Sequence, residues 1–308
     1  MKVAVIGTGL IGRAWAIVFA RGGHDVVLWD QDQAQVARAL ALIRSAAADM
    51  HVAGLIADDA GLAARISAAP SLAAGLSGAG HVQENIPERL ELKTALFSAM
   101  EPLVEEATPL VSSTSALMPS LVFSHLASRH RCLVAHPMNP PHLAPFVELC
   151  GAPFTAAEAI SRTQNFLRQC GMAPIVVNRE IEGFVLNRLQ HALLCEAFRL
   201  IANGYVSASD LDKALKDGLA RRWSFMGPIE TIDLNAPGGV ADYMARYGQT
   251  VRGAGDPKGS GPDWPDDIGQ RLADERRAQV PLEKLADAQV WRDQRLMALA
   301  GHLAKFNR

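Results

Sequence analysis

The sequence predicts an α/β protein in which an N-terminal doubly wound sheet is followed by an all-α C-terminal domain. Three observations at the N-terminus support this fold class. Residues 2–6 form a β-branched run that ends in a glycine turn, residues 11–19 carry apolar side chains at helical spacing, and residues 25–30 resemble a second strand. This order is typical of a βαβ unit, which implies a parallel sheet with helices on its faces.

The chain beyond this unit continues to alternate between helical and strand signals. The segment 32–62 is rich in Ala and lacks Pro, which predicts one long helix or a pair of helices. Further strands are predicted from short apolar runs at residues 110–112, 132–135, 146–149 and 175–177, and residues 81–83 are also strand-like.

Two helix starts are predicted from local signals. Pro87 and Glu88 are expected to open a helix, because Pro is favoured in the first helical turn. Thr155 and Glu158 have the spacing of a capping box, and Gly171 would end the helix that follows them.

From residue 183 onward no run bounded by turn signals alternates with period two, so only helices are predicted. We therefore divide the chain into a domain of residues 1–182 and a helical domain of residues 183–308. In the second domain we expect a helix from 183 to about 203–204, a helix capped by Ser207 and Asp210, a Gly- and Pro-rich loop over 253–269 and an amphipathic helix over 291–306.

Composition excludes several classes of protein. The 308 residues include 30 Lys plus Arg and 32 Asp plus Glu, and the formal charge of −2 provides no excess for binding nucleic acid or an anionic membrane. No apolar run approaches the ~18 residues of a membrane span. The four Cys form no CxxC pair, so we expect no metal site, and reduced thiols in the cytoplasm fit best.

The turn after the first predicted strand has the sequence GTGLIG, a G-x-G-x-x-G fingerprint of Rossmann-type dinucleotide-binding domains. The first Gly allows a tight turn, the second a close approach of pyrophosphate, and the third close packing of helix on strand. A carboxylate after the second strand suits the ribose hydroxyls, and a second acid nearby would repel a 2′-phosphate, which favours NAD over NADP. The expected NAD contacts here are Gly7, Gly9, Leu10, Ile11, Gly12, Asp30 and Gln31. Glycines of an ordinary turn, and Asp30 as a helix cap, are the alternatives.

An enzyme that uses NAD to oxidise an alcohol also needs a base for the hydroxyl proton. His136 ends the predicted strand 132–135, and ligands bind at the carboxyl ends of strands in open α/β sheets. Glu148 lies on another apolar strand, where a buried acid requires a partner. A carboxylate there would orient the imidazole and favour its protonated form. A core histidine, and an ion pair of Glu148 with an arginine, remain alternatives.

Together these motifs resemble the 3-hydroxyacyl-CoA dehydrogenase superfamily, and most closely its branch of L-gulonate 3-dehydrogenases and lambda-crystallins. The stretches that carry the resemblance are residues 7–12, 30–31, 83–88, 112–117, 136–140, 148, 183–190, 218–228 and 291–293. The resemblance implies that His136 is the general acid/base, that Glu148 orients it, and that Ser115 and Asn187 bind the reacting oxygen. It also implies an acid at Glu84 beside the nicotinamide ribose.

The resemblance also bears on the substrate. Arg222 matches an arginine of the gulonate branch that the CoA-specific members lack, and a guanidinium suits a free carboxylate. We therefore expect NAD-dependent oxidation of the 3-hydroxyl of a small hydroxy acid, such as L-gulonate. A 3-hydroxyacyl-CoA dehydrogenase, a diketo-acid reductase and a crystallin-like structural protein that binds NAD are alternatives. Ala116, Pro137 and Met138 depart from the family pattern and leave the substrate open.

The predicted helix after Gly183 carries more apolar residues than one core face needs. They are Phe184, Leu186, Leu189, Leu193, Leu194 and Phe198. Because the family is usually dimeric through its helical domain, we expect a homodimer, with intrachain packing as the alternative.

Overall fold

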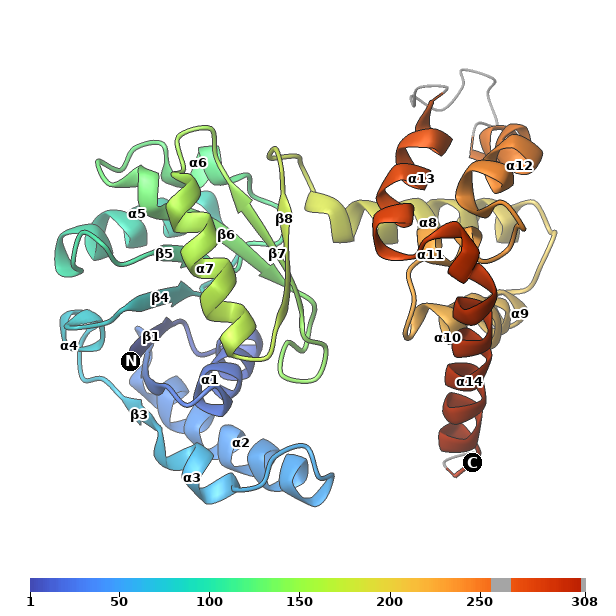
Figure 1. Cartoon of the computed structure of the whole chain (residues 1–308). Coiled ribbons are helices and arrows are strands. Elements are labelled where there is room, and N and C mark those ends of the chain that lie inside the picture. The colour runs from blue at the N-terminus through green and yellow to red at the C-terminus, as the bar shows by residue number, and fades with distance from the viewer. Residues whose placement is uncertain (256–266, 306–308) are drawn as a thin grey trace. The chain divides into compact units, whose positions relative to one another are not determined.

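The computed structural model describes residues 1–255 and 267–305 (Figure 1). The chain divides into two compact units, Met1–Leu194 and Cys195–Arg308. The first unit contains a sheet with helices on both faces, and the described part of the second unit is helical. This arrangement confirms the predicted fold class. The division falls inside α8, which spans Phe184–Ala202.

The first unit is built on an eight-stranded sheet of order β3-β2-β1-β4-β5-β6-β7-β8. The strands are β1 (Lys2–Ile6), β2 (Asp25–Trp29), β3 (Ile66–Ala68), β4 (His81–Glu84), β5 (Leu110–Ser112), β6 (Cys132–Pro137), β7 (Phe146–Gly151) and β8 (Ala173–Val177). Neighbouring strands are parallel except β6 and β7, which are antiparallel. The strand order reverses between β1 and β4, where such sheets open a crevice for ligands.

Helices cover both faces of the sheet. One face is packed by α1 (Leu10–Arg21), α2 (Gln33–Val52), α3 (Asp59–Ala64) and α7 (Ala157–Gln169), and the other by α4 (Leu72–Leu76), α5 (Leu90–Met100) and α6 (Pro119–Phe123). Short 3₁₀ helices lie at Glu101–Leu103 and Arg129–Arg131. Successive side chains of β1 enter opposite layers, Val3 and Val5 one and Ala4 and Ile6 the other, as the period of a strand requires.

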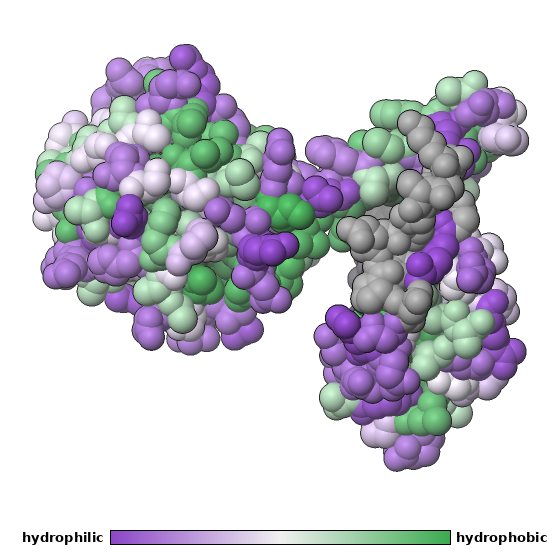
Figure 2. All heavy atoms as spheres, turned by 90° about the horizontal axis from the view of Figure 1, so that it is seen from above, coloured by the Kyte–Doolittle hydropathy of each residue, from purple (hydrophilic) through white to green (hydrophobic). Residues whose placement is uncertain are grey.

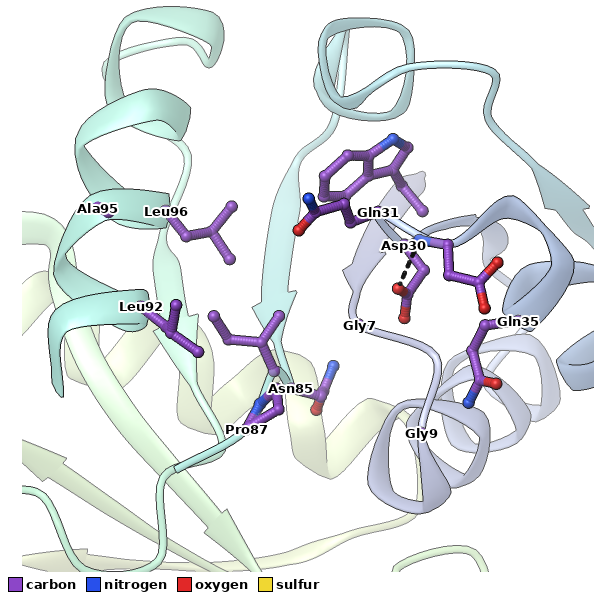
Figure 3. Close-up of a pocket in the computed structure, with 13 residues that line it drawn as sticks. Gly7, Gly9, Asp30, Gln31, Gln35, Asn85, Pro87, Leu92, Ala95 and Leu96 are labelled. Atoms are coloured by element: carbon purple, nitrogen blue, oxygen red, sulfur yellow. Dashed lines mark hydrogen bonds between the residues drawn. The ribbon is translucent and has the colours of Figure 1, made fainter. Parts of the chain in front are cut away.

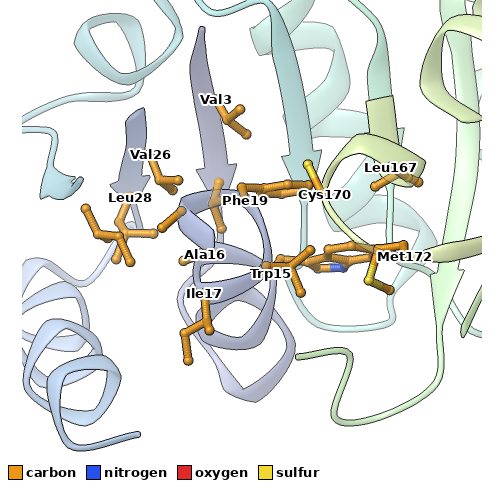
Figure 4. Close-up of a cluster of buried hydrophobic side chains, with 14 of the residues drawn as sticks. Val3, Trp15, Ala16, Ile17, Phe19, Val26, Leu28, Leu167, Cys170 and Met172 are labelled. Atoms are coloured by element: carbon orange, nitrogen blue, oxygen red, sulfur yellow. The ribbon is translucent and has the colours of Figure 1, made fainter. Parts of the chain in front are cut away.

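The core on the α1 face contains a group of stacked aromatic rings among aliphatic side chains (Figure 4). Trp15 and Phe19 are stacked with their ring centroids 5.2 Å apart, and Phe19 also stacks on Phe166 of α7. This packing fixes α1 against the sheet, so the glycine turn before α1 is held in a constant position.

His81 is part of this core, and its burial should make the stability of the folded protein depend on pH. Its ring lies 4.6 Å from that of Phe166, and burial lowers its pKa from 6.5 to about 4. Since the folded-state pKa is depressed, the unfolded chain binds a proton first, and stability present above pH 6.5 is lost as the pH falls toward 4. We expect about 2 kcal/mol of this loss between pH 7 and pH 5. Urea unfolding of His81→Phe should show a smaller loss than wild type, and equal losses would contradict the assignment.

Most predicted elements are confirmed. The segment 32–62 forms the pair α2 and α3, and α8 ends at Ala202, before Gly204 with its positive φ of 75°. In the second unit Ser207 caps α9 (Ala208–Lys213) by accepting a hydrogen bond from the backbone N–H of Asp210. Strand β3 was not predicted from the sequence, because Ile66–Ala68 reads Ile-Ser-Ala and is not an apolar run.

One predicted helix start and one predicted helix cap are wrong. Helix α5 begins at Leu90 and not at Pro87, because the Glu88 carboxylate turns away to accept hydrogen bonds from the backbone N–H groups of Ser115 and Ala116. The capping box before α7 does not form either. Thr155 instead binds Ala152 N–H and the Cys132 carbonyl through its hydroxyl.

The second unit consists of helices in its described residues. Besides α9 they are α10 (Ala220–Trp223), α11 (Pro228–Asp233), α12 (Gly239–Gly255), α13 (Ile268–Gln279) and α14 (Leu285–Ala304), with a π-helical turn at Ala214–Leu219 and a 3₁₀ turn at Leu282–Lys284. The ends of the predicted loop 253–269 are helical, and 256–266 lie outside the described residues. The predicted helix 291–306 is the later part of α14, with Phe306 also outside them.

Hydrophilic and hydrophobic residues are mixed over the face of the first unit seen in Figure 2. Among residues 1–255 and 267–305, the helices are too short or too polar to cross a bilayer.

Candidate active site

The glycine turn between β1 and α1 has the geometry of a dinucleotide-binding loop. Gly7 has a φ of 87°, and a Cβ there would lie 2.8 Å from the backbone of Asn85. A Cβ on Gly12 would lie 1.9 Å from the Gly7 carbonyl oxygen. A Cβ on Gly9, by contrast, would meet no atom within 4 Å. Gly7 and Gly12 are therefore required by the protein itself, whereas Gly9 faces open space that a ligand can fill.

Helix α1 begins directly after this space. Gly9 is its N-cap residue, and no side chain caps the helix. The first N–H groups of a helix point outward, and together with the helix dipole they favour a bound anion. This end of α1 therefore suits the pyrophosphate of NAD.

The difference between Gly9 and Gly12 gives a prediction. Gly9→Ala should fold with an unchanged melting temperature but bind NADH at least about tenfold more weakly, because its methyl group occupies the space for pyrophosphate. Gly12→Ala should lose about 3 kcal/mol of stability, since the Gly7 carbonyl cannot move away. Thermal melting and NADH titration of both variants test this. Equal destabilisation of both, or full NADH affinity in Gly9→Ala, would contradict it.

A pocket of about 740 Å³ opens beside the glycine turn (Figure 3). Asp30, at the end of β2, lines it, and its Oδ2 accepts hydrogen bonds from the backbone N–H and hydroxyl of Thr8. The carboxylate thus holds the turn and keeps lone pairs for ribose hydroxyls. Leu92 and Leu96 of α5 form an apolar wall opposite, which suits an adenine ring. The residues of this pocket therefore fit NAD, and Gln31 also lines it.

His136 and Glu148 form a buried pair. They lie opposite each other where β6 and β7 run antiparallel, and Nδ1 of His136 is 2.8 Å from Oε1 of Glu148. The contact between these two side chains was predicted from the sequence, but the antiparallel pairing of β6 and β7, which makes them cross-strand neighbours, was not. The carboxylate accepts a hydrogen bond from Nδ1, so Nε2 keeps a free lone pair and can accept a proton.

Glu148 also anchors the start of α8. Its Oε2 accepts hydrogen bonds from the backbone N–H groups of Val185 at 2.8 Å and Leu186 at 3.1 Å, and the side chain is fully buried. A carboxylate at a helix N-terminus is favoured by the helix dipole as well as by these bonds. One side chain therefore connects β7, the imidazole and α8.

Ser115 and Asn187 lie next to each other. Asn187, in the first turn of α8, donates from Nδ2 to the backbone carbonyl of Ser115 over 2.8 Å. The Ser115 loop is held in turn by Glu88, whose Oε1 accepts hydrogen bonds from two backbone N–H groups and from the Thr114 hydroxyl. Burial alone would raise the pKa of Glu88, but these hydrogen bonds, that of Thr114 first, lower it.

A second pocket, of about 350 Å³, contains the imidazole. It is lined by Ile11, Asn85, Ile86, Glu88, Lys93, Ser113, Ser115, His136, Pro137 and Asn139. Asn85 and Ile86 also line the larger pocket, so the two pockets share a wall. The His136 side chain therefore lies next to the space beside the glycine turn.

Glu84 does not take the place expected for it. Its side chain is fully buried and lines neither pocket, because it pairs with the equally buried Lys93, whose Nζ lies 2.7 Å from its Oε1. Ser112 and the Ile86 N–H donate to the same carboxylate. Burial raises the pKa of Glu84, and Lys93 opposes the rise.

The acid that lines the second pocket is Glu88, which sequence reasoning assigned to a helix start. Lys93 lines it as well and was missed. A lysine in an otherwise apolar helix stripe, nine residues after an acid on a strand, was the available signal.

Arg222 lies in α10 of the second unit. It lines a shallow pocket there with Asp217, Arg221 and Leu296. Arg221 pairs with Asp217 at 3.3 Å, so the two neighbouring arginines differ in their surroundings.

Groups that could hold a metal ion are absent from the part of the chain that the structure describes. Cys132, Cys150 and Cys170 are buried free thiols, and Cys195 is exposed. Burial raises the pKa of each of the three buried thiols to about 12, so they are poor nucleophiles.

Comparison with known proteins shows the family of the chain. Residues 2–181 match the family model of the 3-hydroxyacyl-CoA dehydrogenase NAD binding domain, and residues 183–258 match that of its C-terminal domain. The chain is 41% identical to the lambda-crystallin homolog of Mus musculus over 303 residues, which cover 97% of this chain and 95% of that protein. It is 34% identical to the L-carnitine dehydrogenase of Streptomyces griseus over 81% of this chain and 74% of that protein.

A solved structure has the same fold over nearly the whole length. It is 5-formyl-3-hydroxy-2-methylpyridine 4-carboxylic acid 5-dehydrogenase, described as an NAD⁺-dependent dismutase, with a TM-score of 0.76 and 25% identity. The match covers 98% of each chain.

Proposed function

The chain belongs to the 3-hydroxyacyl-CoA dehydrogenase family of NAD-dependent dehydrogenases, and we propose that it oxidises the 3-hydroxyl of a small, free hydroxy acid to the 3-keto acid. The observation that supports this most is the buried His136–Glu148 pair, at 2.8 Å, in a pocket that shares a wall with the cofactor pocket. In this proposal residues 1–182 bind NAD and residues 183–308 contribute to substrate binding.

His136 acts as the general base in this direction. The hydroxyl proton moves to Nε2 as the C3–H bond breaks and the C3=O bond forms. Bound NAD⁺ supplies the acceptor for the hydride. Glu148 holds the ring through Nδ1 and stabilises the positive charge that the ring gains. In the reverse direction the protonated ring donates to the keto oxygen.

Ser115 and Asn187 bind the reacting oxygen. A hydroxyl and a carboxamide can donate hydrogen bonds while remaining neutral, which suits an oxygen whose negative charge changes during hydride transfer. The Asn187–Ser115 bond of 2.8 Å keeps the two residues together, and the Glu148 bonds fix the start of the helix that carries Asn187.

Arg222 binds the substrate carboxylate in this proposal. L-carnitine, on which one relative acts, is a free 3-hydroxy acid, so the family includes enzymes for such substrates. A guanidinium binds a carboxylate through two parallel hydrogen bonds, which a methionine cannot replace.

Steady-state rates of NAD reduction test the substrate class. We expect turnover of L-gulonate or a short 3-hydroxy acid, and a KM for it that rises at least about tenfold in Arg222→Met, because a charge-assisted contact is lost. The matched variant Arg221→Met removes a guanidinium paired with Asp217 and should leave KM within about threefold.

Other outcomes would overturn parts of the proposal. Turnover of 3-hydroxybutyryl-CoA alone would assign a thioester substrate, and reduction of diketo acids alone would assign a reductase. No substrate-dependent rate, in wild type or His136→Ala, would favour a structural protein that binds NAD.

The protein forms a homodimer in this proposal. Leu189 and Phe198 of α8 are each 64% exposed, and Leu193 and Leu194 are exposed as well, so a second copy would cover an apolar stripe. Light scattering coupled to gel filtration should give twice the chain mass, and Phe198→Asp should shift it toward the monomer. A wild-type monomer would contradict this.

Reduced cysteines suit the cytoplasm, where we place the enzyme.

A further inference from the structure

Asp32 lies at the rim of the cofactor pocket, next to Asp30. It is the N-cap residue of α2, and its Oδ1 accepts a hydrogen bond from the Ala34 N–H over 2.9 Å. Its own N–H donates to Oδ1 of Asp30 over 3.1 Å, the bond drawn in Figure 3. The two carboxylates are thus placed side by side on the ribose end of the pocket.

The other oxygen of Asp32 engages Arg38, which reaches back along α2. Nη2 of Arg38 lies 2.9 Å from Oδ2 of Asp32 and 2.8 Å from Oε1 of Gln35. Asp32 and Gln35 both line the pocket, so the guanidinium is in contact with two residues of the pocket lining. Desolvation alone would raise the pKa of Asp32, but the hydrogen bond from Arg38, followed by that from Ala34, lowers it.

We propose that Asp32 determines cofactor specificity by holding Arg38, which would otherwise bind the 2′-phosphate of NADP. A phosphate monoester carries nearly two negative charges, and guanidinium groups bind it through paired hydrogen bonds. The chain therefore contains the cation of an NADP site but neutralises it. Asp30 contributes by binding the ribose hydroxyls, and Asp32 acts at one remove, through the arginine.

The geometry explains why removing Asp32 should release Arg38. Both side chains of the ion pair are more than half exposed, at 59% for Arg38 and 58% for Asp32. Such a pair is held weakly, and water can solvate either partner. Without Asp32 the guanidinium keeps only the neutral Gln35 contact and can turn toward a phosphate in the pocket.

Asp32→Ser is the informative variant, because serine also caps helices but its hydroxyl carries no charge that could hold Arg38. Titrations of intrinsic nucleotide fluorescence should give an NADPH Kd about tenfold lower than in wild type, and an NADH Kd within about threefold. In the double variant D32S/R38A the gain in NADPH affinity should disappear. Raising NaCl from 50 to 500 mM should reduce the gain.

Asp58→Ser is a matched control. Asp58 caps α3 by accepting a hydrogen bond from the Gly61 N–H at 2.8 Å. It lines neither the cofactor pocket nor the pocket that contains His136. The substitution Asp58→Ser changes the net charge by the same amount as Asp32→Ser and should leave NADPH affinity unchanged. An NADPH Kd of D32S equal to that of wild type, in a protein with unchanged NADH affinity, would overturn the proposal. A gain in NADPH affinity that persists in D32S/R38A, or that also occurs in Asp58→Ser, would overturn it too. No hydroxy acid is present, so the result does not depend on the substrate.

Discussion

His136→Gln should reduce kcat for NAD reduction by about 10³-fold while leaving the NADH Kd within about threefold of wild type. Glutamine fills a similar volume and can donate to the Glu148 carboxylate, but it cannot take up a proton. His136 lines the pocket that contains Ser115 and not the one beside Asp30, so the nucleotide should still bind. Stopped-flow absorbance of NADH formation measures the loss of rate directly.

Two controls separate catalysis from folding. His125→Gln replaces an exposed histidine whose Nε2 contacts the Thr94 carbonyl and the Ser98 hydroxyl, and its kcat should equal that of wild type. Added imidazole should restore part of the rate of His136→Ala, since a small base can enter the space left by the side chain. A kcat of His136→Gln within about tenfold of wild type would show that another group takes the proton.

Glu148→Gln should lower both stability and kcat. If the amide oxygen accepts from His136 Nδ1, the amide N–H₂ faces the N–H groups of Val185 and Leu186, and donors then oppose donors. The other orientation forces the imidazole into the wrong tautomer. We expect a loss of about 1–3 kcal/mol from unpaired buried groups and a kcat lower by about 10²- to 10⁴-fold.

Glu101→Gln provides the comparison for Glu148. Its carboxylate also accepts a hydrogen bond from a backbone N–H, that of Ser128, but Glu101 lines neither the cofactor pocket nor the pocket that contains His136. Its variant should lose little stability and no activity in urea unfolding and rate measurements. If Glu148→Gln behaved like Glu101→Gln, the carboxylate would not be needed to position the imidazole.

The sequence predicted those parts of the site whose signals are local. The glycine turn follows β1 directly. As the spacing indicated, Gly7 makes the tight turn, Gly9 faces open space and Gly12 packs closely against the turn. The domain order and α8 could also be predicted, because strand patterns end at Gly183 and glycines bound the helix that follows.

The remaining features depend on contacts between distant segments, which local patterns do not encode. The contact of His136 with Glu148 could be proposed from the sequence, but the antiparallel direction of β7 could not, because a strand buried on both faces has no pattern that marks its direction. Glu84 and Glu88 lie four residues apart, and the partners that hold Glu84 inside the protein, Lys93 and Ser112, come from other elements. The N–H groups of α8 that bind Glu148 have no sequence signal, since any residue can provide them.

The structure of the non-reacting complex with NADH and a 3-hydroxy acid substrate tests the central claim most directly. We predict His136 Nε2 within about 2.6–3.2 Å of the 3-hydroxyl oxygen, and C3 about 3–3.5 Å from C4 of the nicotinamide ring. A nicotinamide bound in a pocket separate from the imidazole, with the hydroxyl out of reach of His136, would contradict it.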